Sequence, residues 1–162
     1  MLTFEQARKI VSDQLANSNF SNDDSLIILD NLTIEKPYAW IFSYTSKLLH
    51  ETKDDKYLIA GNSPIIVNKK TGKQTSYPSA YNEIMELYEE EENIYNLVLT
   101  DSNLLNNSKL LLLKDKMKFS YEKLMGVKKE KNFCIDKGSQ SRLTSLQIEL
   151  LKIGIETELI FS

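Results

Sequence analysis

The sequence is poor in the residue types that build disulfides and metal sites. Its 162 residues include one cysteine, Cys134, and one histidine, His50. A single cysteine excludes an intramolecular disulfide, and the two residues together leave too few sulfur and nitrogen ligands for a zinc site. We therefore expect no disulfide, no metal and no cofactor.

Long apolar runs and glycine clusters are also missing. No stretch approaches 18 consecutive apolar residues, and the opening "MLTFEQARKI" lacks a charged region followed by an apolar one. We therefore expect no membrane association and no signal peptide, and we expect the protein in the cytoplasm. The five glycines are scattered singly, so we expect no phosphate-binding loop.

Positive charge is scarce in the first part of the chain. Residues 1–95 carry 9 Lys and Arg against 15 Asp and Glu, whereas residues 96–162 carry 11 against 8. This distribution provides no basic stripe of the kind that binds nucleic acids, so we expect no nucleic-acid partner. The change in charge indicates two domains, which we predict at 1–93 and 94–162.

The first domain has the pattern of a helix, a meander of antiparallel strands and a second helix. Thr3 and Gln6 form a capping box ahead of an amphipathic helix. The second helix follows "PSA", with Ser79 as its N-cap and with Ile84, Leu87 and Tyr88 facing inward. The predicted strands lie at 26–34, 38–45 and 56–61 and in a hairpin at 64–77, in which Gly72 supplies the left-handed turn position.

The second domain has the element order β-α-α-β-α-β. Strands are indicated by "IYNLVLT", "NFCID" and "IETELIF", and helices by "SKLLLLKDKMK", "SYEKLM" and "LTSLQIELLKIG". Gly154 marks the end of the last helix. The two halves together predict an α+β fold.

The strand at 38–45 is the most distinctive feature of the sequence. Tyr38, Trp40, Phe42 and Tyr44 occupy alternate positions and therefore share one face of a strand. Large aromatic side chains usually form a core under helices. Because tyrosine and tryptophan are also enriched at interface hot spots, the row could instead face the second domain or a partner.

A family likeness runs through the first domain. The segments "LTFEQARKIV", "EKPYAWIF" and "AGNSPIIVNKKTG" resemble the YrhB-like immunity-protein family of bacterial polymorphic toxin systems, the group numbered thirty-five, over about residues 2–91. Such proteins are small cytoplasmic α+β proteins that bind and block a cognate toxin. The YrhB member has been described as chaperone-like. The resemblance implies a binding protein that neutralises a toxin by occlusion, or a small client-binding protein.

The second domain is similar in pattern to the C-terminal domain of the bacterial ribosomal stalk protein. The likeness over about residues 95–162 rests on "NLVLT", "CIDKG" and "LQIELLKIGIETEL". The glycine-rich turn with which that family engages translation factors is replaced by "KMKFSYEK", which contains no glycine. The resemblance therefore implies the fold without the translation role.

The acidic residues suggest two further functions. Asp54 and Asp55 in a loop could support a hydrolase, but no nucleophile or catalytic motif accompanies them, so we expect no enzyme. The run at Glu89, Glu90 and Glu91 could steer the chain towards a basic toxin. We predict partner contacts at Tyr38, Trp40, Glu89, Glu90 and Glu91.

Overall fold

The computed structural model of the chain has an α+β fold divided into two compact units, Met1–Ile84 and Met85–Ser162. It describes residues 1–18, 20–21, 23–78, 80–100, 106–127, 129 and 133–162. The division falls inside helix α3 (Tyr81–Glu91), which runs from one unit into the other. The predicted boundary at 93/94 follows the end of this helix and stays a prediction.

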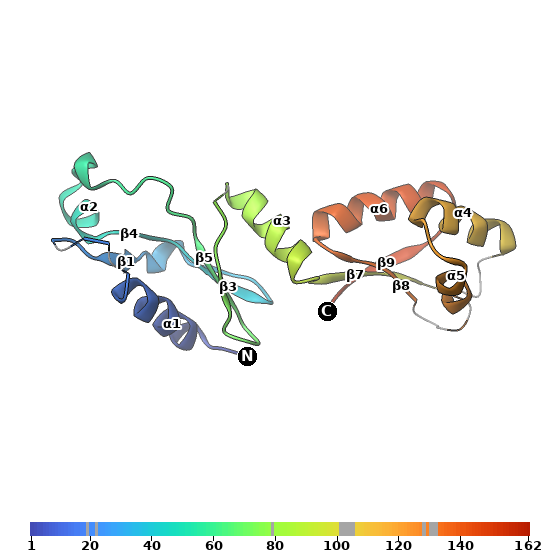
Figure 1. Cartoon of the computed structure of the whole chain (residues 1–162), viewed down its shortest axis with the longest axis horizontal. Helices are drawn as coiled ribbons and strands as arrows, with labels where there is room; N and C mark the ends of the chain where they lie inside the picture. Colours follow the sequence, from blue (N-terminus) through green and yellow to red (C-terminus); the bar gives the residue numbers. More distant parts are fainter. Residues whose placement is uncertain (19, 22, 79, 101–105, 128, 130–132) are drawn as a thin grey trace. The chain divides into compact units, whose positions relative to one another are not determined.

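The first unit opens with helix α1 (Phe4–Ala16), in blue in Figure 1. The Thr3 side chain accepts a hydrogen bond from the Gln6 N–H, and the Gln6 side chain accepts one from the Thr3 N–H. This confirms the predicted capping box. Ala7, Val11 and Leu15 form the buried stripe of the helix.

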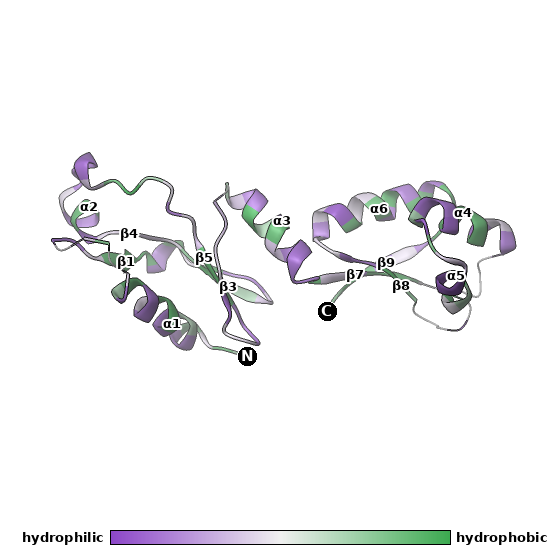
Figure 2. Cartoon of the chain, in the orientation of Figure 1, coloured by the Kyte–Doolittle hydropathy of each residue, from purple (hydrophilic) through white to green (hydrophobic). Residues whose placement is uncertain are grey.

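Two small antiparallel sheets follow α1. The first pairs β1 (Leu26–Ile28) with β4 (Tyr44–Ser46). The second has the order β2-β3-β5-β6. Its strands are β2 (Ile34–Glu35), β3 (Ala39–Phe42), β5 (Ile65–Asn68) and β6 (Gln74–Thr75). Figure 2 colours β5 as strongly apolar, and Ile65, Ile66 and Val67 are all buried.

The predicted strand at 38–45 is wrong as a single strand, because it divides between the two sheets at Ser43. The cause lies on the neighbouring segment, where the 3-10 turn η1 (Asp30–Leu32) separates β1 from β2. β1 pairs with β4, and β2 pairs with β3. The same turn divides the predicted strand at 26–34.

The prediction of a strand at 56–61 is also wrong. Its first residues belong to a 3-10 turn, η2 (Asp55–Tyr57), which the Asp54 carboxylate caps by accepting from the Lys56 N–H. The short helix α2 (Lys47–Thr52) was not predicted. Its N-cap is Ser46, whose hydroxyl accepts from the Leu49 N–H. The available signal was Ser46 itself, a residue type that commonly caps the start of a helix.

The predicted hairpin is confirmed as β5 and β6. Gly72 has φ +72°, and its N–H donates to the Asn68 carbonyl to close the turn. Ile84 and Tyr88 of α3 are buried as predicted, whereas Leu87 is 42% exposed, contrary to the prediction. The predicted N-cap of this helix, Ser79, lies outside the described residues.

The second unit contains a three-stranded antiparallel sheet with the order β8-β7-β9. Its strands are β7 (Tyr95–Leu99), β8 (Cys134–Gly138) and β9 (Thr157–Phe161). Its helices are α4 (Asn107–Met117), α5 (Tyr121–Val127) and α6 (Gln140–Lys152). This confirms the predicted β-α-α-β-α-β order. Figure 1 shows α6 running along the sheet.

The core of the second unit combines all of these elements. Leu97 and Leu99 of the sheet pack with residues of the helices, including Leu113, Leu143 and Leu150, all of them buried. Gly154 has φ +73° after the end of α6, which agrees with its predicted role as the stop. None of the helices that the structure describes combines the length and the apolarity needed to cross a membrane.

Candidate functional site

The aromatic row lies against α1. Trp40, Phe42 and Tyr44 belong to the cluster that surrounds the buried face of this helix. The Phe4 ring, at the start of α1, meets the Trp40 ring edge-on at 5.5 Å between centroids. This confirms the interpretation of the row as a core. Ala39 and Ile41, on the other face of β3, are buried as well, so the strand is covered on both faces.

Trp40 is held by polar contacts in addition to this packing. Its indole Nε1 donates to the Leu2 carbonyl at 3.2 Å. The Lys69 ammonium lies 4.4 Å from the ring centroid and pairs with the Glu35 carboxylate at 2.6 Å. Lys69 is only 6% exposed, so its charge is balanced by Glu35 and by the face of the indole. These contacts tie the N-terminus, β2 and the β5-β6 hairpin to one side chain.

The predicted contact residues differ in how much surface they offer. Tyr38 is 5% exposed and Glu89 is 8% exposed, whereas Trp40 and Glu90 are partly buried and Glu91 is exposed. A partner can cover only surface that the free protein exposes. Direct contact through Tyr38 or Glu89 would therefore require local rearrangement, and the role of all five residues in binding stays a prediction.

Glu89 and Glu90 meet the N-terminus of α6. The Glu90 carboxylate accepts from the Ser139 N–H at 2.8 Å, and the Glu89 carboxylate accepts from the Gln140 N–H at 3.0 Å. Backbone donors at a helix start have no partner within the helix and favour negative charge. These two glutamates therefore accept hydrogen bonds from backbone N–H groups that would otherwise lack a partner at the start of α6. This gives them a structural role that the sequence did not reveal.

Arg142 completes this polar cluster. Its guanidinium pairs with Glu90 at 2.8 Å and with Asp136 at 2.5 Å. The hydrogen bond from Arg142 is the main cause that holds the pKa of Glu90 below its ordinary value of 4.5. Gly138 has φ +150°, and a Cβ there would collide with both Glu90 and Arg142. Position 138 therefore requires glycine both for its backbone conformation and for the space.

An exposed face of α3 carries acidic side chains around a leucine. Glu83, Leu87 and Glu91 are spaced four residues apart and therefore share a stripe of the helix, with Glu86 beside it. All four residues are exposed. An apolar centre with a charged rim is the usual layout of a contact surface between proteins.

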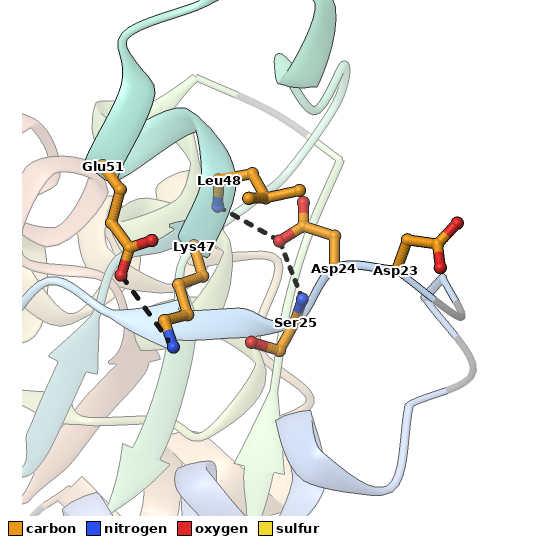
Figure 3. Close-up of a pocket in the computed structure, with 6 residues that line it drawn as sticks. All are labelled: Asp23, Asp24, Ser25, Lys47, Leu48 and Glu51. Carbon is orange, nitrogen blue, oxygen red and sulfur yellow. Dashed lines mark hydrogen bonds and ion pairs between the residues drawn. The ribbon is translucent and has the colours of Figure 1, made fainter.

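The pocket drawn in Figure 3 is lined mainly by polar groups that already interact with one another. Asp24 accepts from the Leu48 N–H at 3.1 Å and from the Ser25 N–H at 2.8 Å, and the Ser46 hydroxyl also donates to it. Lys47 and Glu51 form an ion pair across one helical turn at 3.9 Å. The carboxylate of Asp24 therefore accepts hydrogen bonds at the start of α2 and stabilises this helix.

The loop carboxylate proposed for a hydrolase is similarly engaged. Asp54 pairs with the Lys56 ammonium at 3.0 Å, and the hydrogen bond from Lys56 lowers the pKa of Asp54. A lowered pKa makes this carboxyl a poorer general acid near neutral pH. Within the described ranges, no three His, Cys, Asp or Glu side chains gather in a way that could hold a metal ion.

Comparison with known families finds a match for the first part of the chain. The family model described as Immunity protein 35 matches residues 5–91, which is more than half of the 162 residues. The chain belongs to the Immunity protein 35 family. The resemblance noted in the sequence is thereby confirmed. The region matched to the Immunity protein 35 family runs from α1 to the last residue of α3 and contains all five predicted contact residues.

The remaining comparisons add no relatives. No curated protein and no solved structure matches the chain. The likeness of residues 95–162 to the ribosomal stalk domain is not supported by any match and stays a prediction. The second unit lies almost entirely beyond the part that matches the Immunity protein 35 family.

Proposed function

We propose that this chain is an immunity protein that neutralises a cognate bacterial polymorphic toxin by stoichiometric contact. The match of residues 5–91 to the Immunity protein 35 family carries the proposal. The mechanism is occlusion, in which a preformed surface covers a part of the toxin that its activity requires. No bond chemistry is then required of this chain, and it acts as a binding protein in the cytoplasm.

A well-packed first unit supports this mechanism. The α1 helix, β3 and β5 share one apolar cluster, and Trp40 links three further segments to it. The α3 helix lies outside this cluster, but the buried Tyr88 and the hydrogen bonds of Glu89 and Glu90 to the start of α6 hold it in place, so its exposed face is also ordered before binding. Binding then costs less conformational entropy, which favours high affinity.

The exposed face of α3 is the surface that we assign to the toxin contact. It lies within the part that matches the family and combines Glu83, Glu86 and Glu91 with the exposed Leu87. A leucine at the centre of an acidic rim suits a basic partner with an apolar recess. Glu91 is thereby retained from the predicted contacts, whereas Glu89 and Glu90 hold the start of α6.

The proposal is tested by using the full chain as bait in the producing bacterium. We expect one large protein with a toxin-like C-terminal domain to co-purify in a one-to-one ratio, and co-expression of this chain to relieve its toxicity. A diffuse set of unrelated proteins, each bound weakly, would contradict the immunity function and favour a chaperone-like role.

A further inference from the structure

The β9 strand forms an edge of the three-stranded sheet. In the part of the chain that the structure describes, β9 pairs with β7 alone. The Ser162 N–H donates to the Ile94 carbonyl and the Thr100 N–H to the Glu156 carbonyl, so even-numbered residues of this segment point their backbone groups at β7. Because backbone directions alternate along a strand, the N–H and C=O groups of Leu159 point towards the free edge.

This edge lacks the features that usually prevent strands from pairing between molecules. Proteins protect sheet edges with lysine, proline, bulges or very short strands. The β2 and β6 strands have two residues each, and β8 has an irregular register against β7 and carries Lys137. In contrast, β9 has five residues, pairs regularly with β7 and carries a single charge, Glu158.

The flank of α6 above this edge is uncharged. The Gln147 side chain donates to the Thr157 carbonyl at 2.7 Å, which places this side of the helix over β9. Thr144, Ile148 and Leu151 lie three or four residues from Gln147 or from one another and therefore share its side of α6. Ile148 is 52% exposed and Leu151 is 60% exposed.

Two of the charges of α6 lie on its other side, and the third, Lys152, is the last residue of the helix and borders this flank, four positions after Ile148. Arg142 pairs with Glu90 and Asp136, and Glu149 pairs with Lys116 of α4 at 2.5 Å. The flank beside the sheet edge thus combines apolar and neutral polar groups, and depletion of charge is the compositional mark of an interface centre.

We propose that β9 is a self-association edge at which a second copy of this chain pairs its own β9 in the antiparallel direction. A two-fold axis through Leu159 sets Thr157 opposite Phe161 and Glu158 opposite Ile160, so like charges are not directly opposed. The two sheets become one continuous sheet, and the uncharged flanks of the two α6 helices meet beside it. The Thr157 carbonyl keeps its bond to Gln147, since a carbonyl oxygen accepts two hydrogen bonds.

An identical copy fits this edge for a reason of composition. In an isologous contact the same patch lies on both sides of the interface, so it tolerates apolar and neutral residues and rejects clusters of one charge. Thr144, Gln147, Ile148 and Leu151 satisfy this condition. The self-association is independent of the proposed toxin contact, because it uses β9 and α6, outside the part matched to the family.

The test is the molar mass of the purified full chain, measured by light scattering on a size-exclusion column and by sedimentation velocity. We expect a species of twice the 18.7 kDa monomer mass to form as the protein concentration rises to about 100 µM. The variant Ile148→Asp/Leu151→Asp should weaken dimerisation by about a hundredfold, since two apolar contacts are replaced by opposed like charges. The matched control Leu111→Asp/Leu112→Asp alters two exposed leucines of α4 and should leave the dimer intact.

Hydrogen exchange provides a second readout that does not depend on variants. The Leu159 amide should exchange more slowly as the protein concentration rises, because its N–H is bonded only in the dimer. A chain that is monomeric at all concentrations would overturn the proposal. So would a dimer that survives the α6 double variant, or one in which Leu159 exchange is independent of concentration.

Discussion

Neighbouring glutamates of α3 have different environments. Glu89 and Glu90 accept hydrogen bonds from the start of α6, whereas Glu91 is exposed. The sequence shows only a run of like residues. The partner of Glu90 is Arg142, 52 positions further along the chain, so no local pattern could indicate which glutamate is structural.

Replacing Glu90 should make the stability of the protein less dependent on pH. Because the pKa of Glu90 is lowered in the folded protein, its carboxylate stabilises the fold above its ordinary value of 4.5, and this stabilisation is lost as the pH falls towards the folded pKa. Glu90→Gln should therefore lower the free energy of unfolding by about 1 kcal/mol at pH 7, a modest value because the group is partly exposed. The difference from the parent should shrink in denaturant titrations below pH 4.5.

The matched control for this titration is Glu86→Gln, an exposed residue of the same helix. It should change the free energy of unfolding by less than about 0.5 kcal/mol at any of these pH values. Equal effects of the two substitutions would mean that the hydrogen bonds of Glu90 do not stabilise α6.

Trp40 provides the second prediction at this scale. Its ring packs against Phe4 and lies under Lys69, so Trp40→Ala should lower the free energy of unfolding by about 3 kcal/mol. Circular dichroism in denaturant is the suitable measurement, because the variant has no tryptophan left to report by fluorescence. Tyr121→Ala, which removes an exposed aromatic ring, should have little effect. An unchanged unfolding midpoint for Trp40→Ala, together with weaker toxin binding, would assign Trp40 to the interface.

At the scale of single elements, the sequence predicted those features that depend on nearby residues. The capping box of α1, the β5-β6 hairpin and the stop at Gly154 all involve residues within a few positions of one another. The division of the strand at 38–45 could not be predicted in this way. It depends on η1, which interrupts the pairing from the neighbouring strand.

The same distinction applies to the candidate site. The family likeness and the aromatic row were both visible in the sequence, because motif spacing and alternation are local. The sequence could not show that α1 covers the aromatic row, since this depends on how the helix packs against the sheet. The prediction that Leu87 faces inward was wrong, because this residue lies at the boundary of the buried stripe formed by Ile84 and Tyr88.

Gly72 is the element-scale test of the hairpin. With φ +72°, Gly72→Ala should lower the free energy of unfolding by about 1 kcal/mol, because a side chain disfavours this backbone conformation. Gly72→Asn should cost less, since asparagine tolerates the left-handed region better. The ranking is measured by thermal unfolding, and an alanine variant as stable as the parent would show that the turn relaxes to another conformation.

At the scale of the whole molecule, charge is unevenly divided, and the proposed toxin contact lies on an acidic helix. Glu83→Lys/Glu86→Lys should slow association with the toxin by about tenfold at low salt, and the difference from the parent should shrink as salt rises. Surface plasmon resonance measures both rates. The control Glu5→Lys/Asp13→Lys makes the same change in net charge on the exposed side of α1. Equal slowing by both variants would show that net charge, and not the α3 face, steers the encounter.

The most direct test of the immunity function is a titration of the purified cognate toxin with the purified chain, with residual toxin activity as the readout. Stoichiometric occlusion predicts that activity falls linearly and reaches zero at one chain per toxin. Full inhibition by a small fraction of an equivalent would indicate that the chain acts catalytically on the toxin. Undiminished activity at several equivalents would contradict neutralisation altogether.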